Sequence, residues 1–136
     1  MRDIEFRGKR VSDDKWIYGY MADMESINNV NEVATPCEEV NPDTIGQWTG
    51  LYDTYGKKIY EDDIVECVSW NEYFSDGTGK PMEPFRRRMY IKFTKGAFKM
   101  VESMPHPMTD NEWDIIFNGD IEVIGNIHDN YELLKK

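Results

Sequence analysis

One stretch of the sequence decides the fold class: Met89-Tyr90-Ile91-Lys92-Phe93-Thr94-Lys95-Gly96-Ala97-Phe98-Lys99-Met100-Val101. Aromatic and β-branched residues, which favour strands, stand on both sides of a short polar turn. The turn, Thr94-Lys95-Gly96, ends in a glycine, and glycine adopts the backbone angles that a tight hairpin turn requires. The stretch therefore predicts a β-hairpin of residues 89–93 and 97–101.

The same pattern of short apolar runs and turns continues toward the N-terminus. Residues 4–7 alternate apolar and polar side chains, and residues 16–21 are rich in aromatic and β-branched residues, so we expect a second hairpin there. Gly19 within the latter run indicates a bulge or a close backbone approach. Two further strands are expected at residues 44–49 and 64–68. Turns are expected at Asn41-Pro42-Asp43 and at Asp53-Thr54-Tyr55-Gly56.

Toward the C-terminus, residues 71–84 contain two glycines and two prolines and predict a long loop. Residues 122–127 predict a last strand, followed by one helical turn at residues 129–134 with Asp129 or Asn130 as its cap. Helical periodicity is not sustained beyond two turns anywhere, although a helix between residues 107 and 117 stays open. The sequence therefore predicts an all-β (mainly β) protein.

Composition places the chain among compact globular proteins. Its 136 residues are 40% hydrophobic and 13% aromatic, enough for one domain or for two small β modules. Apolar runs are shorter than a membrane span, and the N-terminus is charged from Arg2 onward without the apolar segment of a secretory signal. We therefore expect a protein of a bacterial cytoplasm in which Cys37 and Cys67 are reduced thiols with a structural or incidental role.

Charge is distributed unevenly along the sequence. Residues 80–99 contain seven lysines and arginines and one carboxylate, a local charge of +6, whereas the chain has a net charge of −10. The remainder therefore has a charge of −16, which argues against general affinity for DNA or anionic membranes. A basic segment on an acidic protein suits nucleic acid, an acidic partner or another copy of the chain.

The candidate interaction residues are the cations of this segment: Arg86, Arg87, Arg88, Lys92 and Lys95. Together with Tyr90, Phe93 and Phe98 they would suit nucleic acid, because arginines neutralise phosphates and exposed aromatic rings stack on bases. The simpler interpretation is a hairpin whose aromatic rings belong to the core and whose cations are solvated or paired with acidic residues. A contact between copies of the chain is the intermediate possibility.

Catalytic and metal sites are not predicted. The run Glu61-Asp62-Asp63 with Glu66 contains the ligands that hard cations prefer, but consecutive strand residues point to opposite faces and the spacing of a calcium-binding loop is lacking. His106 and His128 are the only histidines, and motifs for nucleophiles, phosphates or dinucleotides do not occur. We therefore expect a protein without a cofactor that is not an enzyme. An unfamiliar catalytic site around Asp62, Asp63 or His128 is the third alternative.

Three segments together resemble the YopX family of phage and prophage proteins. They are Arg2-Asp3-Ile4-Glu5-Phe6-Arg7-Gly8-Lys9 with Trp16-Ile17-Tyr18-Gly19; Asp43-Thr44-Ile45-Gly46-Gln47-Trp48-Thr49-Gly50-Leu51-Tyr52-Asp53 with Gly56-Lys57-Lys58-Ile59-Tyr60-Glu61-Asp62-Asp63-Ile64-Val65; and Glu122-Val123-Ile124-Gly125-Asn126-Ile127 with Glu132-Leu133-Leu134. The chain departs from the family pattern at Asp62, where glycine is usual, and at Tyr131, where proline is frequent. Asp tolerates a left-handed turn better than most residues, so the turn is expected to survive.

The resemblance implies a β-rich fold with a barrel-like C-terminal part, and it supplies no mechanism. We expect an N-terminal β subdomain at residues 1–49 and a small SH3-like barrel at residues 50–136. Gly50, Gly56, Asp62 and Gly96 are expected to be structural turn residues. The function expected is that of a phage or prophage accessory protein that binds protein or assembles with itself; the alternative is a nucleic-acid-binding protein that uses the basic hairpin.

Overall fold

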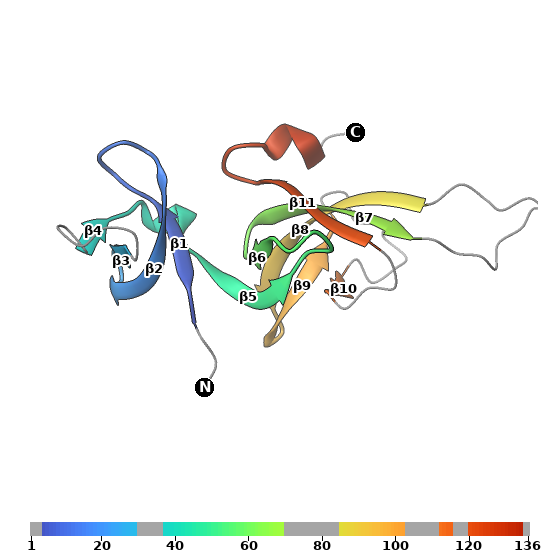
Figure 1. The fold of residues 1–136 in the computed structure, drawn as a ribbon, viewed down its shortest axis with the longest axis horizontal. Helices are drawn as coiled ribbons and strands as arrows, with labels where there is room; N and C mark the ends of the chain where they lie inside the picture. The colour runs from blue at the N-terminus through green and yellow to red at the C-terminus, as the bar shows by residue number, and fades with distance from the viewer. Residues whose placement is uncertain (1–3, 30–36, 70–84, 103–111, 116–119, 135–136) are drawn as a thin grey trace, which may run out of the picture. The chain divides into compact units, whose positions relative to one another are not determined.

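The computed structural model describes residues 4–29, 37–69, 85–102, 112–115 and 120–134, and within them the protein is mainly β (Figure 1). Its contacts divide the chain into two compact units, residues 1–51 with 58–61 and residues 52–57 with 62–136. The sequence suggested a boundary between residues 49 and 50. In the structure the first unit continues to Leu51 and also includes residues 58–61.

The first unit is built on a six-stranded sheet of order β4-β3-β2-β1-β5-β6. The pairs β1–β2, β2–β3, β3–β4 and β1–β5 are antiparallel. Its elements are β1 (Phe6–Lys9), β2 (Trp16–Asp23), β3 (Ser26–Asn29), β4 (Cys37–Glu39), the 3-10 turn η1 (Pro42–Thr44), β5 (Gly46–Tyr52) and β6 (Lys58–Tyr60).

Strands β1 to β4 close into a ring. Arg10, just after β1, forms a bridge with Val40, just after β4, and Val11 N and Asn41 N donate to Glu39 O and Lys9 O. The ring encloses the buried side chains of Ile17, Ile27 and Val40, with Phe6, Met21 and Ile45 packed against them. This small core explains why apolar residues alternate along β2.

Gly19 lies in β2 where the backbone of β3 passes very close. A Cβ atom on Gly19 would lie 1.7 Å from Asn28 O, so no larger residue fits without separating the strands. The predicted hairpin of the first two strands and the close approach at Gly19 are both confirmed.

The second unit is built on a five-stranded antiparallel sheet of order β10-β9-β8-β7-β11. The side chains buried against one face come from four of its strands and include Val65, Cys67, Met89, Ile91, Met100, Ile121 and Val123. Its elements are β7 (Asp63–Ser69), β8 (Phe85–Thr94), β9 (Ala97–Val101), β10 (Glu112–Asp114), β11 (Asp120–Asn126) and the 3-10 turn η2 (Tyr131–Leu134).

The predicted hairpin of β8 and β9 is confirmed, with Thr94 facing Ala97 across a two-residue turn. Both turn residues, Lys95 at φ 52° and Gly96 at φ 81°, have left-handed angles, the combination of the turn whose twist matches paired strands. The last strand and the helical turn after it are confirmed as β11 and η2. The SH3-like barrel stays a prediction, and the expected loop at residues 71–84 lies outside the described residues.

Candidate interaction surface

The three consecutive arginines on β8 point alternately to the two faces of the sheet of the second unit. Arg86 and Arg88 share a face with Glu66 of β7, and each places a nitrogen 3.1 Å from one of its carboxylate oxygens. Arg87 points to the other face and lies 2.6 Å from the carboxylate of Glu102. All three therefore have an acidic neighbour within their own unit.

Glu66 is the centre of the first of these arrangements. The hydrogen bond from Arg88, and after it that from Arg86, lowers the pKa of Glu66 in spite of its partial burial. Arg88 also donates to the carbonyl of Leu133 at 3.3 Å, which ties η2 to the strand. Arg88 thus contributes to the fold as well as to the surface charge.

The two candidate lysines lie at the other end of the strand, where the hairpin turns. Lys92 and Lys95 are exposed, and Lys92 faces Lys99 across the strand pair. Phe93 points to the face opposite Lys92, and it is 52% exposed although its ring packs edge-on against Phe98 with centroids 5.1 Å apart. This end of the hairpin combines positive charge with an exposed aromatic ring held in one orientation.

The four residues expected at structural turns all have left-handed backbone angles. Gly50, Gly56 and Gly96 have φ of 86°, 87° and 81°, and Asp62 has φ of 71°. Gly50 lies inside β5 rather than between strands. Left-handed angles strain most side chains, so these positions restrict the residue that they can carry.

Asp53 organises a turn that the sequence marked but whose side chains it did not single out. The buried carboxylate of Asp53 accepts hydrogen bonds from the backbone of Tyr55, Lys57 and Val123. Thr54 is bonded to Ile121 through both its backbone nitrogen and its hydroxyl. The turn is therefore fastened to β11, while Tyr55, 70% exposed, projects from it. The sequence signal that could have indicated an exposed Tyr55 is its position inside an Asp-x-x-Gly turn.

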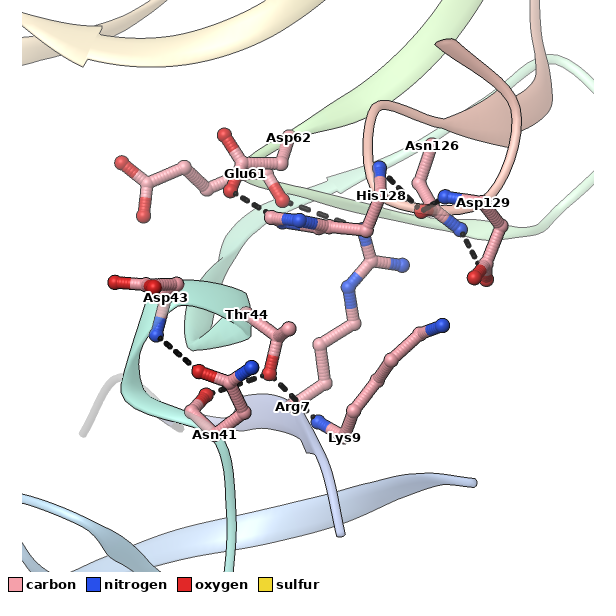
Figure 2. A network of polar contacts seen from close by, with 10 residues as sticks. All are labelled: Arg7, Lys9, Asn41, Asp43, Thr44, Glu61, Asp62, Asn126, His128 and Asp129. Carbon is pink, nitrogen blue, oxygen red and sulfur yellow. Dashed lines mark hydrogen bonds and ion pairs between the residues drawn. The ribbon is translucent and has the colours of Figure 1, made fainter. Parts of the chain in front are cut away.

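Arg7 in the first unit was also missed. It is 6% exposed, and its guanidinium carbon lies 4.6 Å from the ring centroid of Trp16 and 4.9 Å from that of Tyr60. It donates to the carbonyl of Glu61 at 3.3 Å, as Figure 2 shows. Alternating residues on β1 and β2 could have suggested that Arg7 and Trp16 share a face, but the third member comes from β6, 53 positions further along the chain than Arg7.

A second polar group of the first unit, also drawn in Figure 2, fixes the start of β5. Asn41 accepts from Asp43 N at 3.1 Å, and the hydroxyl of Thr44 donates to Asn41 O while accepting from Lys9 N. The turn predicted at Asn41-Pro42-Asp43 is confirmed, and in it Asn41 caps η1.

Comparison with known proteins adds the family. The model of the YopX family, described as YopX protein, matches residues 5–135. The chain belongs to the YopX family. The crystal structure of protein EF1440 from Enterococcus faecalis is similar at 22% identity and a TM-score of 0.55, covering 99% of this chain and 100% of that chain, which shows a shared fold. The curated proteins contain no match.

Asp62, where the YopX pattern usually has glycine, lies in the second unit opposite His128. The nearest ring nitrogen of His128 is 3.0 Å from the carboxylate of Asp62, a pair shown in Figure 2. Asn126 supports this arrangement by accepting from the backbone of His128 and Asp129 and by donating to the carboxylate of Asp129. The carbonyl of Asp62 accepts from Ile127, so both its backbone and its side chain hold the segment after β11.

In the described residues of this YopX protein, the acidic and sulfur-containing side chains do not form a metal-binding cluster. Among the residues that the structure describes, no three His, Cys, Asp or Glu side chains are placed to share a metal ion. Cys37 of the first unit is exposed and Cys67 of the second is buried, and both are free thiols. Burial raises the pKa of Cys67 to about 11. In the same described part of the chain, no helix is long and apolar enough to span a membrane.

Proposed function

We propose that this YopX-family protein is a phage or prophage accessory protein of the bacterial cytoplasm that works by binding protein, first of all its own copies, without catalysing a reaction. Membership in the YopX family supports the origin, because the family that the sequence resembles is one of phage and prophage proteins. The molecular part of the proposal rests on the surface of the second unit.

The observation that carries it is the pairing of the three arginines. Nucleic-acid affinity comes largely from cations that neutralise phosphates. Arg86 and Arg88 share Glu66, and Arg87 is paired with Glu102, so a phosphate would have to compete with carboxylates that are already in place. The pairing favours a partner other than nucleic acid.

Exposed rings held by the fold favour a protein partner. Phe93 is packed against Phe98 yet half exposed, and Tyr55 projects from the turn that Asp53 fastens. A rigid aromatic side chain gives a large contact at a low cost in conformational entropy, which is why such residues are enriched in protein interfaces.

Charge favours a second copy as that partner. The net charge is −10, and the exposed cations Lys92 and Lys95 are concentrated at one hairpin. Opposite charges on one molecule allow two copies to attract each other while like surfaces repel.

The contacts of Asp62 and His128 support a structural role for these two side chains, which a catalytic site in this region would need. Asp62 contacts His128 with its carboxylate, accepts from Ile127 with its carbonyl and donates its N–H to Ile91. These contacts join the end of β11 to the start of β7, which is a role in folding.

Size-exclusion chromatography with light scattering at low and high salt tests the proposal. We expect a mass above that of the 16.0 kDa chain at low salt and a shift toward that mass as salt screens the charges. A strict monomer under both conditions, at all protein concentrations tried, would refute self-association.

Nucleic-acid binding is the second candidate, favoured by the exposed cations Lys92 and Lys95 and the exposed ring of Phe93 near the end of one hairpin. It predicts a salt-sensitive shift of single-stranded or double-stranded oligonucleotides that the triple change Arg86→Ala, Arg87→Ala, Arg88→Ala abolishes. No shift at low salt would discard it.

A further inference from the structure

Strand β11 is at the edge of the sheet of the second unit, with β7 as its neighbour on one side. In an antiparallel pair, alternate residues direct their backbone groups to opposite edges of the strand. Ile121, Val123 and Asn126 direct their N–H groups away from β7, toward acceptors in other parts of the second unit. The β-bulge between Val123 and Gly125 explains why the alternation changes before Asn126.

The acceptors of these three N–H groups are all side-chain oxygens. In chain order, the pairs are Ile121 N with Thr54 Oγ1 at 2.9 Å, Val123 N with Asp53 Oδ2 at 3.0 Å and Asn126 N with Asn130 Oδ1 at 3.3 Å. A backbone strand in the same place would present a new row of N–H and C=O groups on its far side, whereas side-chain oxygens present none. The sheet therefore ends at these side chains.

The acceptors from Asp53 and Thr54 are held in place by their own turn. The other carboxylate oxygen of Asp53 accepts from Tyr55 N at 2.9 Å and from Lys57 N at 2.8 Å. Thr54 N donates to Ile121 O at 2.9 Å, so Thr54 binds both backbone groups of Ile121. The turn thus occupies the position that a further strand of the sheet would take.

The sequence of β11 would pair readily if this edge were open. Its run Ile121-Glu122-Val123-Ile124 has three β-branched residues, which favour strand pairing. An edge strand with unoccupied N–H and C=O groups is a template for a strand of another chain. Two copies of β11 could join edge to edge in an antiparallel pair, because a two-fold contact places the same surface on both copies.

We propose that the side chains of Asp53 and Thr54 block a strand-pairing edge at Ile121 and Val123, and that β11 of a second copy pairs there once these acceptors are lost. The proposal goes beyond the proposed function, in which copies bind through charged and aromatic side chains. The two contacts respond differently to salt. Salt screens the attraction between exposed charges, whereas backbone hydrogen bonds between paired strands do not depend on it in this way.

Removal of the acceptors tests the proposal, with light scattering and amide exchange at high salt as the measurements. Asp53→Ala with Thr54→Val removes both acceptors of the turn. In dilute solution of this double variant we expect the amides of Ile121 and Val123 to exchange at least about tenfold faster than in the unaltered protein. At higher concentration its mass should rise from 16.0 kDa to about twice that value, with both amides protected again.

Single variants separate the open edge from a loss of stability. Thr54→Val removes one acceptor with little change of shape and should show the same behaviour at Ile121 alone. Thr54→Ser keeps the hydroxyl and should behave like the unaltered protein. Thr49→Val removes a buried hydroxyl of the first unit, which donates to Ile59 O and accepts from Leu51 N, so it should lower stability without causing association. Thermal unfolding followed by circular dichroism compares the stabilities.

Three results would overturn the proposal. The first is association of the double variant without renewed protection of Ile121 and Val123, and the second is equal association of Thr49→Val; both indicate aggregation after a loss of stability. The third is faster exchange in a double variant that stays monomeric at every concentration. If the double variant does not fold, Thr54→Val decides by the same criteria at Ile121. The proposed function is tested on the unaltered protein, so it does not depend on these results.

Discussion

Arg7 of the first unit and the arginine run of the second unit show two opposite uses of arginine. In the first, Arg7 is 6% exposed and lies between the rings of Trp16 and Tyr60, with a hydrogen bond to a carbonyl. In the second, Arg86 and Arg88 keep 61% and 47% of their side chains exposed and share one carboxylate. The sequence drew attention to the arginine run, and Arg7 was passed over.

A run of charged residues in the sequence therefore does not show which interactions each charged side chain makes in the fold. A guanidinium between aromatic faces and out of water is held by interactions that solvent does not screen. An exposed ion pair gains little, because water and salt weaken it. Arg7 should therefore stabilise the fold more than Arg86 or Arg88, and the following predictions test that ranking.

The largest effect is expected for Arg7→Met. Methionine keeps the apolar stem but removes the cation between the two rings and the hydrogen bond to Glu61 O, so unfolding of the first unit should become easier by about 2–4 kcal/mol. Urea unfolding monitored by tryptophan fluorescence measures it, with Arg86→Met as the matched control at about 0.5 kcal/mol. Equal losses for the two variants would contradict the ranking.

A smaller difference is expected within the second unit. Arg88→Ala loses the contact with Glu66 and the bond to Leu133 O, whereas Arg86→Ala loses only the former. We expect about 1 kcal/mol for Arg88 and about half of that for Arg86. Amide exchange should also speed up at residues 133–134 only in Arg88→Ala, and unchanged exchange there would show that η2 does not depend on Arg88.

The shared carboxylate makes part of this stability depend on pH. The pKa of Glu66 is lowered in the folded protein from an ordinary value of 4.5, so its contribution is complete above that pH and is lost as the pH falls through the lower folded value. Glu66→Gln should therefore be less stable than the unaltered protein at pH 7 by under about 1 kcal/mol and equally stable near pH 2. Urea unfolding at both pH values measures the difference, and a gap that persists in acid would contradict the linkage.

The thiols reverse the comparison, because here the first unit has the exposed group. Cys37 is exposed, whereas Cys67 is 1% exposed and has its pKa raised to about 11. The thiolate is the reactive form, so a thiol reagent at pH 8 should modify one cysteine in the folded protein and two in denaturant. Cys37→Ser should leave the folded protein unreactive. Rapid modification of that variant would show that the core of the second unit opens readily.

Much of the secondary structure and several turn positions could be predicted because their causes are local. Alternation in β2, the Lys95-Gly96 turn and the turn at Asn41-Pro42-Asp43 each depend on a few consecutive residues. Family membership could likewise be predicted, since the motifs span nearly the whole chain. The expected recognition role of the arginine run stays a prediction.

Strands, turns and the left-handed angles at Gly50, Gly56, Asp62 and Gly96 could be expected from the sequence, because they depend on steric limits within a few residues. Overall charge follows from composition. Which charged side chains are paired and which aromatic rings are exposed depends on the tertiary structure. Arg7 meets Tyr60, Arg10 meets Val40 and Asp62 meets His128 only when strands far apart in the chain pair. Strand pairing depends on the free energy of the whole sheet, so no local pattern could have specified these contacts.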